Sequence, residues 1–158
     1  MKPRIYIETS VISYLAARPS AEVTNASRQF YSHELWKRRG AWDLLVSEAV
    51  VREAAFGDAD AARTRLDYCK QLTMVDVRVE ADIIAAALIR RTASPAKAFA
   101  DAAHIAIASA QAADFIASWN FRHIAGAVSR RKLETTLEAI GAHVPTIATP
   151  EEIVENLK

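Results

Sequence analysis

Four polar residues that lie far apart in the sequence are the candidates for chemistry: Glu8, Glu53, Asp101 and Asn120. Three of them carry a carboxylate, and the fourth carries an amide oxygen. Carboxylates held a few ångströms apart repel each other or share a proton unless a cation lies between them. Because Mg²⁺ and Mn²⁺ take oxygen ligands of this kind, these residue types predict a divalent-metal site wherever the fold brings them together.

The segments around three of these candidates predict strands that end beside them. Residues 5–7 are three consecutive strand formers, so Glu8 follows a strand that we expect to be buried on both faces. Residues 42–47 predict a second strand, Ser47 is expected to be the N-cap of the helix after it, and Glu53 lies in that helix. Asn120 ends a later predicted strand. Taken singly, each residue also has an ordinary explanation, as a turn former or a solvated helix residue.

Asp101 lies in a predicted helix that begins at Ser94 and Pro95, since proline is favoured at the first helical position. Apolar residues recur there at steps of three and four and predict the face on the core: Phe99, Ala103, Ile107 and Ala110. His104 follows Asp101 by about one turn. We interpret it as a histidine that packs in the core or supports the site, rather than as a ligand. A preceding helix over residues 79–91 is expected to turn four residues inward: Ile83, Ile84, Ala87 and Leu88.

Three other helix starts are expected nearer the N-terminus. A short helix or turn is predicted from Val11 to Ala17, and Ser20 or Thr24 is predicted to cap the longer helix that follows. Asp58 is predicted to start another helix.

Strands that alternate with helices along the chain predict an α/β fold. We expect a single domain over residues 1–158, with a mostly parallel central sheet of four to five strands and helices on both faces. In such sheets functional groups gather beyond the C-terminal ends of the strands. This rule selects the four candidates, because it places them at one edge of the sheet.

Composition narrows the class of protein without assigning an activity. The net charge of +1 provides no global field for nucleic acid, so any such contact must use a local patch. The single Cys69 rules out an internal disulfide framework. With no signal peptide and no apolar stretch of membrane-spanning length, we expect a soluble cytoplasmic protein.

Five stretches, in this order, resemble the PIN-domain family of metal-dependent ribonucleases: Ile5-Tyr-Ile-Glu-Thr-Ser-Val-Ile12, Val46-Ser-Glu-Ala-Val-Val-Arg-Glu53, Asp101-Ala-Ala-His-Ile-Ala-Ile107, Phe115-Ile-Ala-Ser-Trp-Asn120 with Phe121-Arg-His-Ile-Ala125, and Thr149-Pro-Glu-Glu-Ile-Val154. The resemblance covers almost the whole chain. It implies a three-layer sandwich with a parallel sheet and an acidic pocket that holds one or two Mg²⁺ or Mn²⁺ ions. The family's three acids fall on Glu8, Glu53 and Asp101, and its hydroxyl beside the first acid falls on Thr9 or Ser10.

Two positions depart from the family pattern. The first acid is usually aspartate, and Glu8 is longer by one methylene group. The position that is often a fourth aspartate is Asn120, which brings no charge, so a second metal ion should bind more weakly. The run from Trp119 to His123 is similar to a Trp-Asn-x-x-His variant of the family.

The resemblance implies hydrolysis of RNA phosphodiester bonds, typically as the toxin of a toxin–antitoxin pair. In this interpretation Thr9, Ser10 and Asn120 position the attacking water. Five basic residues hold the phosphates of a nucleic-acid strand: Arg122, His123, Arg130, Arg131 and Lys132. A solvated, basic helix start explains those five residues about as well.

Two other classes of function remain as alternatives. One is a PIN-like fold with a weak or inactive site that binds RNA or a partner protein. The other is a small nucleotide-binding protein, which the sequence disfavours because it has neither G-x-G-x-x-G nor a P-loop. The expected partners are RNA, a small antitoxin protein and a second copy of the chain. The homodimer is expected on the apolar helix faces of residues 11–56, which include Val23, Phe30, Tyr31, Leu35 and Trp36.

Overall fold

The computed structural model describes residues 1–91, 95–120 and 127–157. Its centre is a sheet of five strands in the order β3-β2-β1-β4-β5, and every neighbouring pair is parallel. The strands are β1 (Arg4–Ile7), β2 (Asp43–Ser47), β3 (Thr73–Val75), β4 (Phe115–Ala117) and β5 (Thr146–Ala148). The predicted α/β fold with a parallel sheet is therefore confirmed, and the sheet has the larger of the expected strand numbers.

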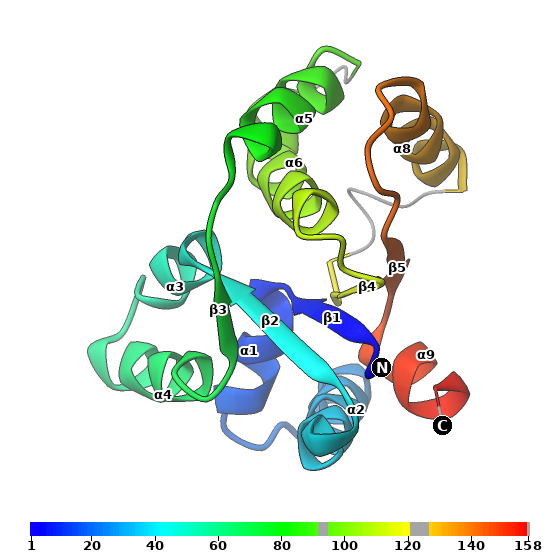
Figure 1. The fold of residues 1–158 in the computed structure, drawn as a ribbon. Helices are drawn as coiled ribbons and strands as arrows, with labels where there is room; N and C mark the ends of the chain where they lie inside the picture. The colour runs from blue at the N-terminus through cyan, green and yellow to red at the C-terminus, as the bar shows by residue number, and fades with distance from the viewer. Residues whose placement is uncertain (92–94, 121–126, 158) are drawn as a thin grey trace.

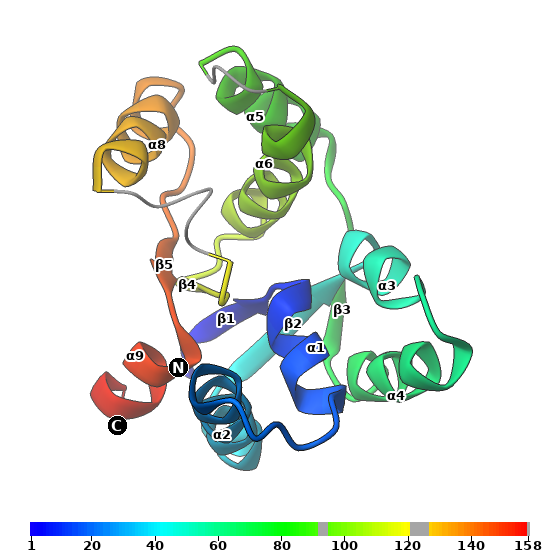
Figure 2. The same cartoon turned by 180° about the vertical axis from the view of Figure 1, so that it is seen from behind.

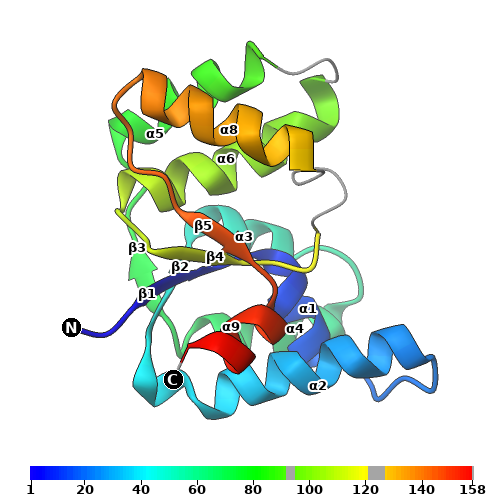
Figure 3. The same cartoon turned by 90° about the vertical axis from the view of Figure 1, so that its right-hand side faces the viewer.

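Helices cover both faces of this sheet and make three layers (Figure 1). One outer layer holds α5 (Val79–Ile89), α6 (Pro95–Ala110) and α8 (Ala127–Ala139). The other holds α1 (Thr9–Ala16), α2 (Val23–Lys37), α4 (Ala59–Cys69) and α9 (Pro150–Asn156). The same division is visible from behind in Figure 2 and most plainly from the side in Figure 3. The short helix α3 (Glu48–Ala54) contacts α1 and α4, and a 3-10 turn, η1 (Arg39–Ala41), precedes β2.

The middle position of β1 follows from its sequence. Ile5, Tyr6 and Ile7 each have at most 1% of their surface exposed, as a strand covered on both faces requires. Tyr6 pairs in register with Leu45 of β2 and with Ile116 of β4. Because these three strands are parallel and in register, their C-terminal ends emerge at the same edge of the sheet.

Side chains at the element ends explain where several helices begin. Glu8 is the N-cap of α1 and accepts a hydrogen bond from the Ser10 N–H, so this helix starts at Thr9, two residues before the predicted Val11. Asp58 caps α4, as predicted. The predicted cap of α2 at Ser20 or Thr24 is wrong, because Glu22 takes that place and accepts from two backbone N–H groups. Acceptor side chains thus satisfy the free N–H groups at these ends.

The helix that carries Asp101 begins where predicted. One residue predicted to face the core in this helix, and one in α5, are exposed instead. Pro95 opens α6, so Asp101 is its seventh residue. The free backbone N–H groups of a helix belong to its first turn, and Asp101 lies beyond that turn. Phe99 is 66% exposed and does not pack on the core. In α5 the predicted inward residue Ile83 is 63% exposed, whereas Ile84, Ala87 and Leu88 are buried.

No helix in the described parts of the chain has both the length and the hydrophobicity needed to cross a membrane.

Candidate metal centre

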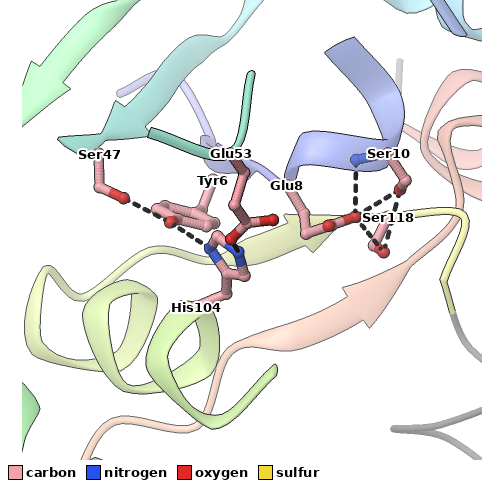
Figure 4. A network of polar contacts seen from close by, with 7 residues as sticks. All are labelled: Tyr6, Glu8, Ser10, Ser47, Glu53, His104 and Ser118. Atoms are coloured by element: carbon pink, nitrogen blue, oxygen red, sulfur yellow. Dashed lines mark hydrogen bonds and ion pairs between the residues drawn. The ribbon is translucent and has the colours of Figure 1, made fainter. Parts of the chain in front are cut away.

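Three ionisable side chains from three elements converge at the C-terminal edge of the sheet: Glu8, Glu53 and His104. Glu8 follows β1, Glu53 lies in α3 and His104 lies in α6. One potential ligand atom from each lies within 4.8 Å of the other two. Figure 4 shows the two carboxylates next to each other, with the imidazole against Glu53. Segments separated by about fifty residues at each step therefore supply one compact cluster.

The Glu8 carboxylate is held by the hydroxyls and backbone around it. The residue is buried, with 7% of its surface exposed. Its Oε2 accepts hydrogen bonds from the backbone N–H of Ser10 at 3.1 Å, from the Ser10 hydroxyl, and from the Ser118 hydroxyl at 2.7 Å. Hydrogen bonds to the charged form of a carboxylate stabilise it. These donors hold the Glu8 carboxylate in one orientation within the cluster.

Glu53 and His104 form an ion pair at the centre of the site. Nε2 of His104 lies 2.5 Å from Oε1 of Glu53, and the Glu53 side chain is 40% exposed while that of His104 is 4% exposed. Burial alone would raise the pKa of Glu53, but hydrogen bonding and charge from His104, with help from Thr9, lower it. Burial would lower the pKa of His104, but the Glu53 hydrogen bond and the charges of Glu53, Glu8 and Asp101 raise it. The pair therefore favours its charged form.

Two further buried groups continue this contact away from the carboxylates. Nδ1 of His104 lies 2.8 Å from the Tyr6 hydroxyl, which lies 2.7 Å from Oγ of Ser47. Tyr6 and Ser47 are completely buried. Burial raises the pKa of Tyr6 far above its usual value, and the charges of Glu53 and Glu8 add to that shift, so the phenol stays protonated.

The structure brings some of the predicted site residues together and leaves another at the rim. Asp101 is partly buried one turn before His104, near enough for its charge to raise the pKa of that histidine. Asn120 is exposed, and it reaches the cluster through its backbone N–H, which donates to Oγ of Ser118 at 2.9 Å. Its predicted role as a water-positioning amide stays a prediction.

The two hydroxyls predicted beside Glu8 lie in different surroundings. Ser10 binds the Glu8 carboxylate, and its Oγ also accepts from the backbone N–H of Trp119 at 2.9 Å. Oγ1 of Thr9 is buried, and no described group completes a hydrogen bond to it. It nevertheless lies near enough to Glu53 to help lower the pKa of that carboxyl. Thr9 thus supplies a spare oxygen at the side of the cluster.

The predicted phosphate-binding residues are only partly described. Arg122 and His123 lie outside the described residues. Arg131 and Lys132 are exposed and Arg130 is half-buried, all three in the first half of α8. That end of α8 lies on the side of the molecule toward which β1 runs (Figure 3). Exposed cations therefore lie on the same side as the carboxylates.

Sequence reasoning missed Ser118, Tyr6 and Ser47 as parts of the site. Ser118 follows β4 just as Glu8 follows β1, and this common position in two neighbouring parallel strands is the signal that marks it. Tyr6 was interpreted only as a strand former and Ser47 only as an N-cap. Nothing in the local sequence shows that the Tyr6 hydroxyl contacts His104 or that the Ser47 hydroxyl contacts Tyr6.

The residues present fit a divalent cation. The carboxylates of Glu8 and Glu53, with the charge of Asp101 nearby, offer hard oxygen ligands of the kind that Mn²⁺ and Mg²⁺ take, and the imidazole of His104 lies against Glu53. Oγ1 of Thr9 adds a buried oxygen beside Glu53, for which no group in the described part of the chain completes a hydrogen bond. An ion here would relieve the repulsion among the acids.

Comparison of the chain with protein-family models finds no match, and comparison with curated proteins finds none either. The chemistry of this centre therefore has to be argued from its own residues.

Proposed function

We propose that this chain is a metal-dependent endoribonuclease of the PIN type, which hydrolyses phosphodiester bonds of RNA with Mg²⁺ or Mn²⁺. The observation that carries the proposal is the cluster of Glu8, Glu53 and His104, whose potential ligand atoms lie within 4.8 Å of one another. The parallel sheet and the order of the motifs agree with the resemblance in the sequence.

Glu8, Glu53 and Asp101 would hold the ion in this proposal, with carboxylate charge as the source of affinity. When bound, such an ion lowers the pKa of a coordinated water and offsets charge that builds on the phosphate. The part of the protein is to orient the acids. Ser10 and Ser118 do this for Glu8 by donating to its Oε2.

The RNA strand would approach along the side of the molecule that carries Arg131 and Lys132. Both side chains are exposed, as contacts with phosphate in solution require. Each phosphate contact of this kind makes binding weaker as salt rises, because binding releases counterions. We therefore expect RNA affinity to fall steeply with ionic strength in spite of the near-neutral net charge.

The test is cleavage of a labelled single-stranded RNA, and of the same sequence as DNA, with Mn²⁺, with Mg²⁺ and with EDTA. Glu8→Gln keeps the shape of the side chain and removes its charge, so we expect a rate loss on the order of 100-fold. Glu48→Gln is the matched control, because Glu48 is an exposed acid at the start of α3 that forms an ion pair with Arg52. Cleavage that persists in EDTA, or equal rates for parent and Glu8→Gln, would overturn the assignment.

We also propose that the nuclease is the toxin of a pair and that it self-associates through α2. Val23 and Phe30 on that helix are 81% and 58% exposed, Tyr31 and Trp36 are partly buried, and Leu35 lies in the core. Light scattering of the parent and of Phe30→Glu tests the dimer, and a monomeric parent would exclude it. Growth arrest on expression, relieved by the product of a neighbouring short reading frame, tests the pair.

A further inference from the structure

His104 lies in the middle of a chain of hydrogen bonds that joins four elements of the fold, α3, α6, β1 and β2. On one side its Nε2 lies 2.5 Å from Oε1 of Glu53. On the other its Nδ1 lies 2.8 Å from the Tyr6 hydroxyl, and that hydroxyl lies 2.7 Å from Oγ of Ser47. Figure 4 shows these contacts. Tyr6 and Ser47 have no exposed surface, and His104 has 3%. Buried polar groups in such a chain are ordered only if every hydrogen has an acceptor.

The Glu53 carboxylate fixes which ring nitrogen of His104 donates to it. An ionised Glu53 can only accept, so Nε2 of His104 must carry a hydrogen and donate it. In the neutral imidazole Nδ1 then accepts from the Tyr6 hydroxyl, and the Tyr6 oxygen accepts from the Ser47 hydroxyl. If the imidazole is protonated, Nε2 still donates to Glu53, Nδ1 donates to the Tyr6 oxygen, and the Tyr6 hydroxyl donates to Oγ of Ser47. Every contact is satisfied in both charge states, and Nε2 is the donor to Glu53 in each.

Ser47 shows that the chain competes with ordinary local structure. It is the N-cap of α3, where a serine hydroxyl usually accepts from a backbone N–H of the first turn. Here its side chain makes no capping hydrogen bond and meets Tyr6 instead. The start of the helix that carries Glu53 is thus tied to the same chain that ends on the Glu53 carboxylate.

Glu53 is the member of the cluster that most needs such support. Its side chain is 40% exposed, in contrast to the buried Glu8, whose Oε2 is held by Ser10 and Ser118. A flexible glutamate loses side-chain entropy when it is held in one rotamer. A donor that is itself held in place by buried partners lowers the cost of ordering Glu53 when an ion binds.

We infer that His104 is a positioning residue for the metal centre: it orients Glu53 through Nε2–H, and Tyr6 and Ser47 fix the ring that does so. The inference rests on the proposed metal-dependent function and assigns a specific part of it. It also distinguishes His104 from a ligand, because a ligand nitrogen must present a lone pair where Nε2 carries its hydrogen.

The protonation of the imidazole nitrogens is the first test. Nitrogen-15 NMR of the His104 ring, recorded without metal and with saturating Mg²⁺ at neutral and alkaline pH, reports which nitrogen carries hydrogen. We expect Nε2 to be protonated in both states. An unprotonated Nε2 in the Mg²⁺-bound protein would make His104 a ligand and overturn the inference.

The second test is Mn²⁺ affinity, measured from the electron paramagnetic resonance signal of the free ion. Tyr6→Phe removes one buried oxygen from β1 and leaves the imidazole unanchored, and His104→Leu removes the donor to Glu53. We expect His104→Leu to bind Mn²⁺ about 10-fold to 100-fold more weakly, with Tyr6→Phe between it and the parent. His104→Gln keeps an N–H donor at the position of Nε2, so its affinity should stay close to that of the parent.

Tyr68→Phe is the matched control. It removes the same atom from a tyrosine on α4 that packs against Trp36 and takes no part in the hydrogen bonds around His104. Parent-like Mn²⁺ affinity in Tyr6→Phe would overturn the positioning role, whether or not His104→Leu folds. If the parent binds Mn²⁺ and cleaves no RNA, the proposed nuclease function is wrong. The Mn²⁺ affinities of the variants still decide the role of His104. If the parent binds no Mn²⁺, both proposals fail.

Discussion

Two carboxylates at this site are held by chemically different means, and this difference governs how each responds to substitution. Oε2 of Glu8 takes its hydrogen bonds from two serines, which stay neutral at every pH of interest. Glu53 takes its hydrogen bond from a histidine whose charge depends on pH. Loss of a serine should therefore act mainly on geometry, whereas any change at His104 also changes the charge next to the proposed ion.

Asp101 gives the first prediction at the scale of a residue. Asp101→Asn removes a charge from the site while keeping the shape of the side chain, and Asn and Asp have similar helix propensities. We expect the fold to survive and the rate of Mn²⁺-dependent RNA cleavage to fall on the order of 100-fold. The measurement is single-turnover cleavage beside a thermal melt in EDTA. Asp82→Asn, at an exposed position in α5, is the control, and equal rates for Asp101→Asn and the parent would remove Asp101 from the site.

The pH dependence of the metal-free protein gives the second prediction. The pKa of His104 is raised from its ordinary 6.5, so its contribution to stability is full below pH 6.5 and is lost as pH rises through the folded-state pKa. The pKa of Glu53 is lowered from 4.5, so its contribution is present above pH 4.5 and is lost as pH falls through its folded-state pKa. Both contributions are therefore complete between pH 4.5 and pH 6.5.

Urea unfolding in EDTA measures this contribution. The free energy of unfolding of the parent should fall as pH rises above 6.5, and it should fall more than in His104→Gln, which cannot titrate there. Titrating groups elsewhere act equally on both proteins and cancel in the difference. Parallel curves for the two proteins would show that the pair does not stabilise the fold.

At the scale of the elements, local signals in the sequence predicted some helix starts and some buried positions, and failed at others. Asp58 and Pro95 mark helix starts in the sequence and in the structure, because capping and proline effects involve only neighbouring residues. Ile83 and Phe99 were assigned to the core and are exposed. Apolar residues lie all around α5, so periodicity could not show which face meets α6.

The site itself was predictable only in part, for the same reason. Glu8 and Glu53 could be found because strand ends in a parallel sheet share an edge. The contacts of His104 with Tyr6 and Glu53 depend on how α6 packs across the sheet. His104 is 98 positions along the sequence from Tyr6 and 51 positions from Glu53. Such packing is set by tertiary structure and leaves no local pattern.

The last helix gives a prediction about an element. Thr149 caps α9 by accepting from the Glu152 N–H at 3.0 Å, and the Glu152 carboxylate accepts from the Thr149 N–H at 2.8 Å. Thr149→Ala removes the first bond and should cost about 1 kcal/mol in the free energy of unfolding. Because α9 packs on α2 and β5, Mn²⁺ affinity should not change. Urea denaturation of Thr149→Ala beside Thr135→Ala, which lies inside α8, measures the effect. Equal stability of Thr149→Ala and the parent would show that the cap is dispensable.

At the scale of the whole molecule, the centre joins the two outer layers through the sheet. Glu8 is the N-cap of α1 in one layer, and His104 lies in α6 in the other. Glu53 lies in α3, which follows β2. An ion bound to these elements contacts residues that come together only in the folded chain. Metal binding and global stability should therefore be linked.

Millimolar Mn²⁺ should consequently raise the melting temperature. An ion at about 100 times its dissociation constant adds about 2.7 kcal/mol to the free energy of unfolding. In a chain of 158 residues, that corresponds to a rise of about 5–10 °C. Glu8→Gln should melt at or above the parent temperature in EDTA, because repulsion between the acids falls, and should gain less from Mn²⁺. Sodium chloride at matched ionic strength separates specific binding from screening. A parent whose melting temperature is the same in EDTA, Mn²⁺ and matched salt would have no metal centre of this kind.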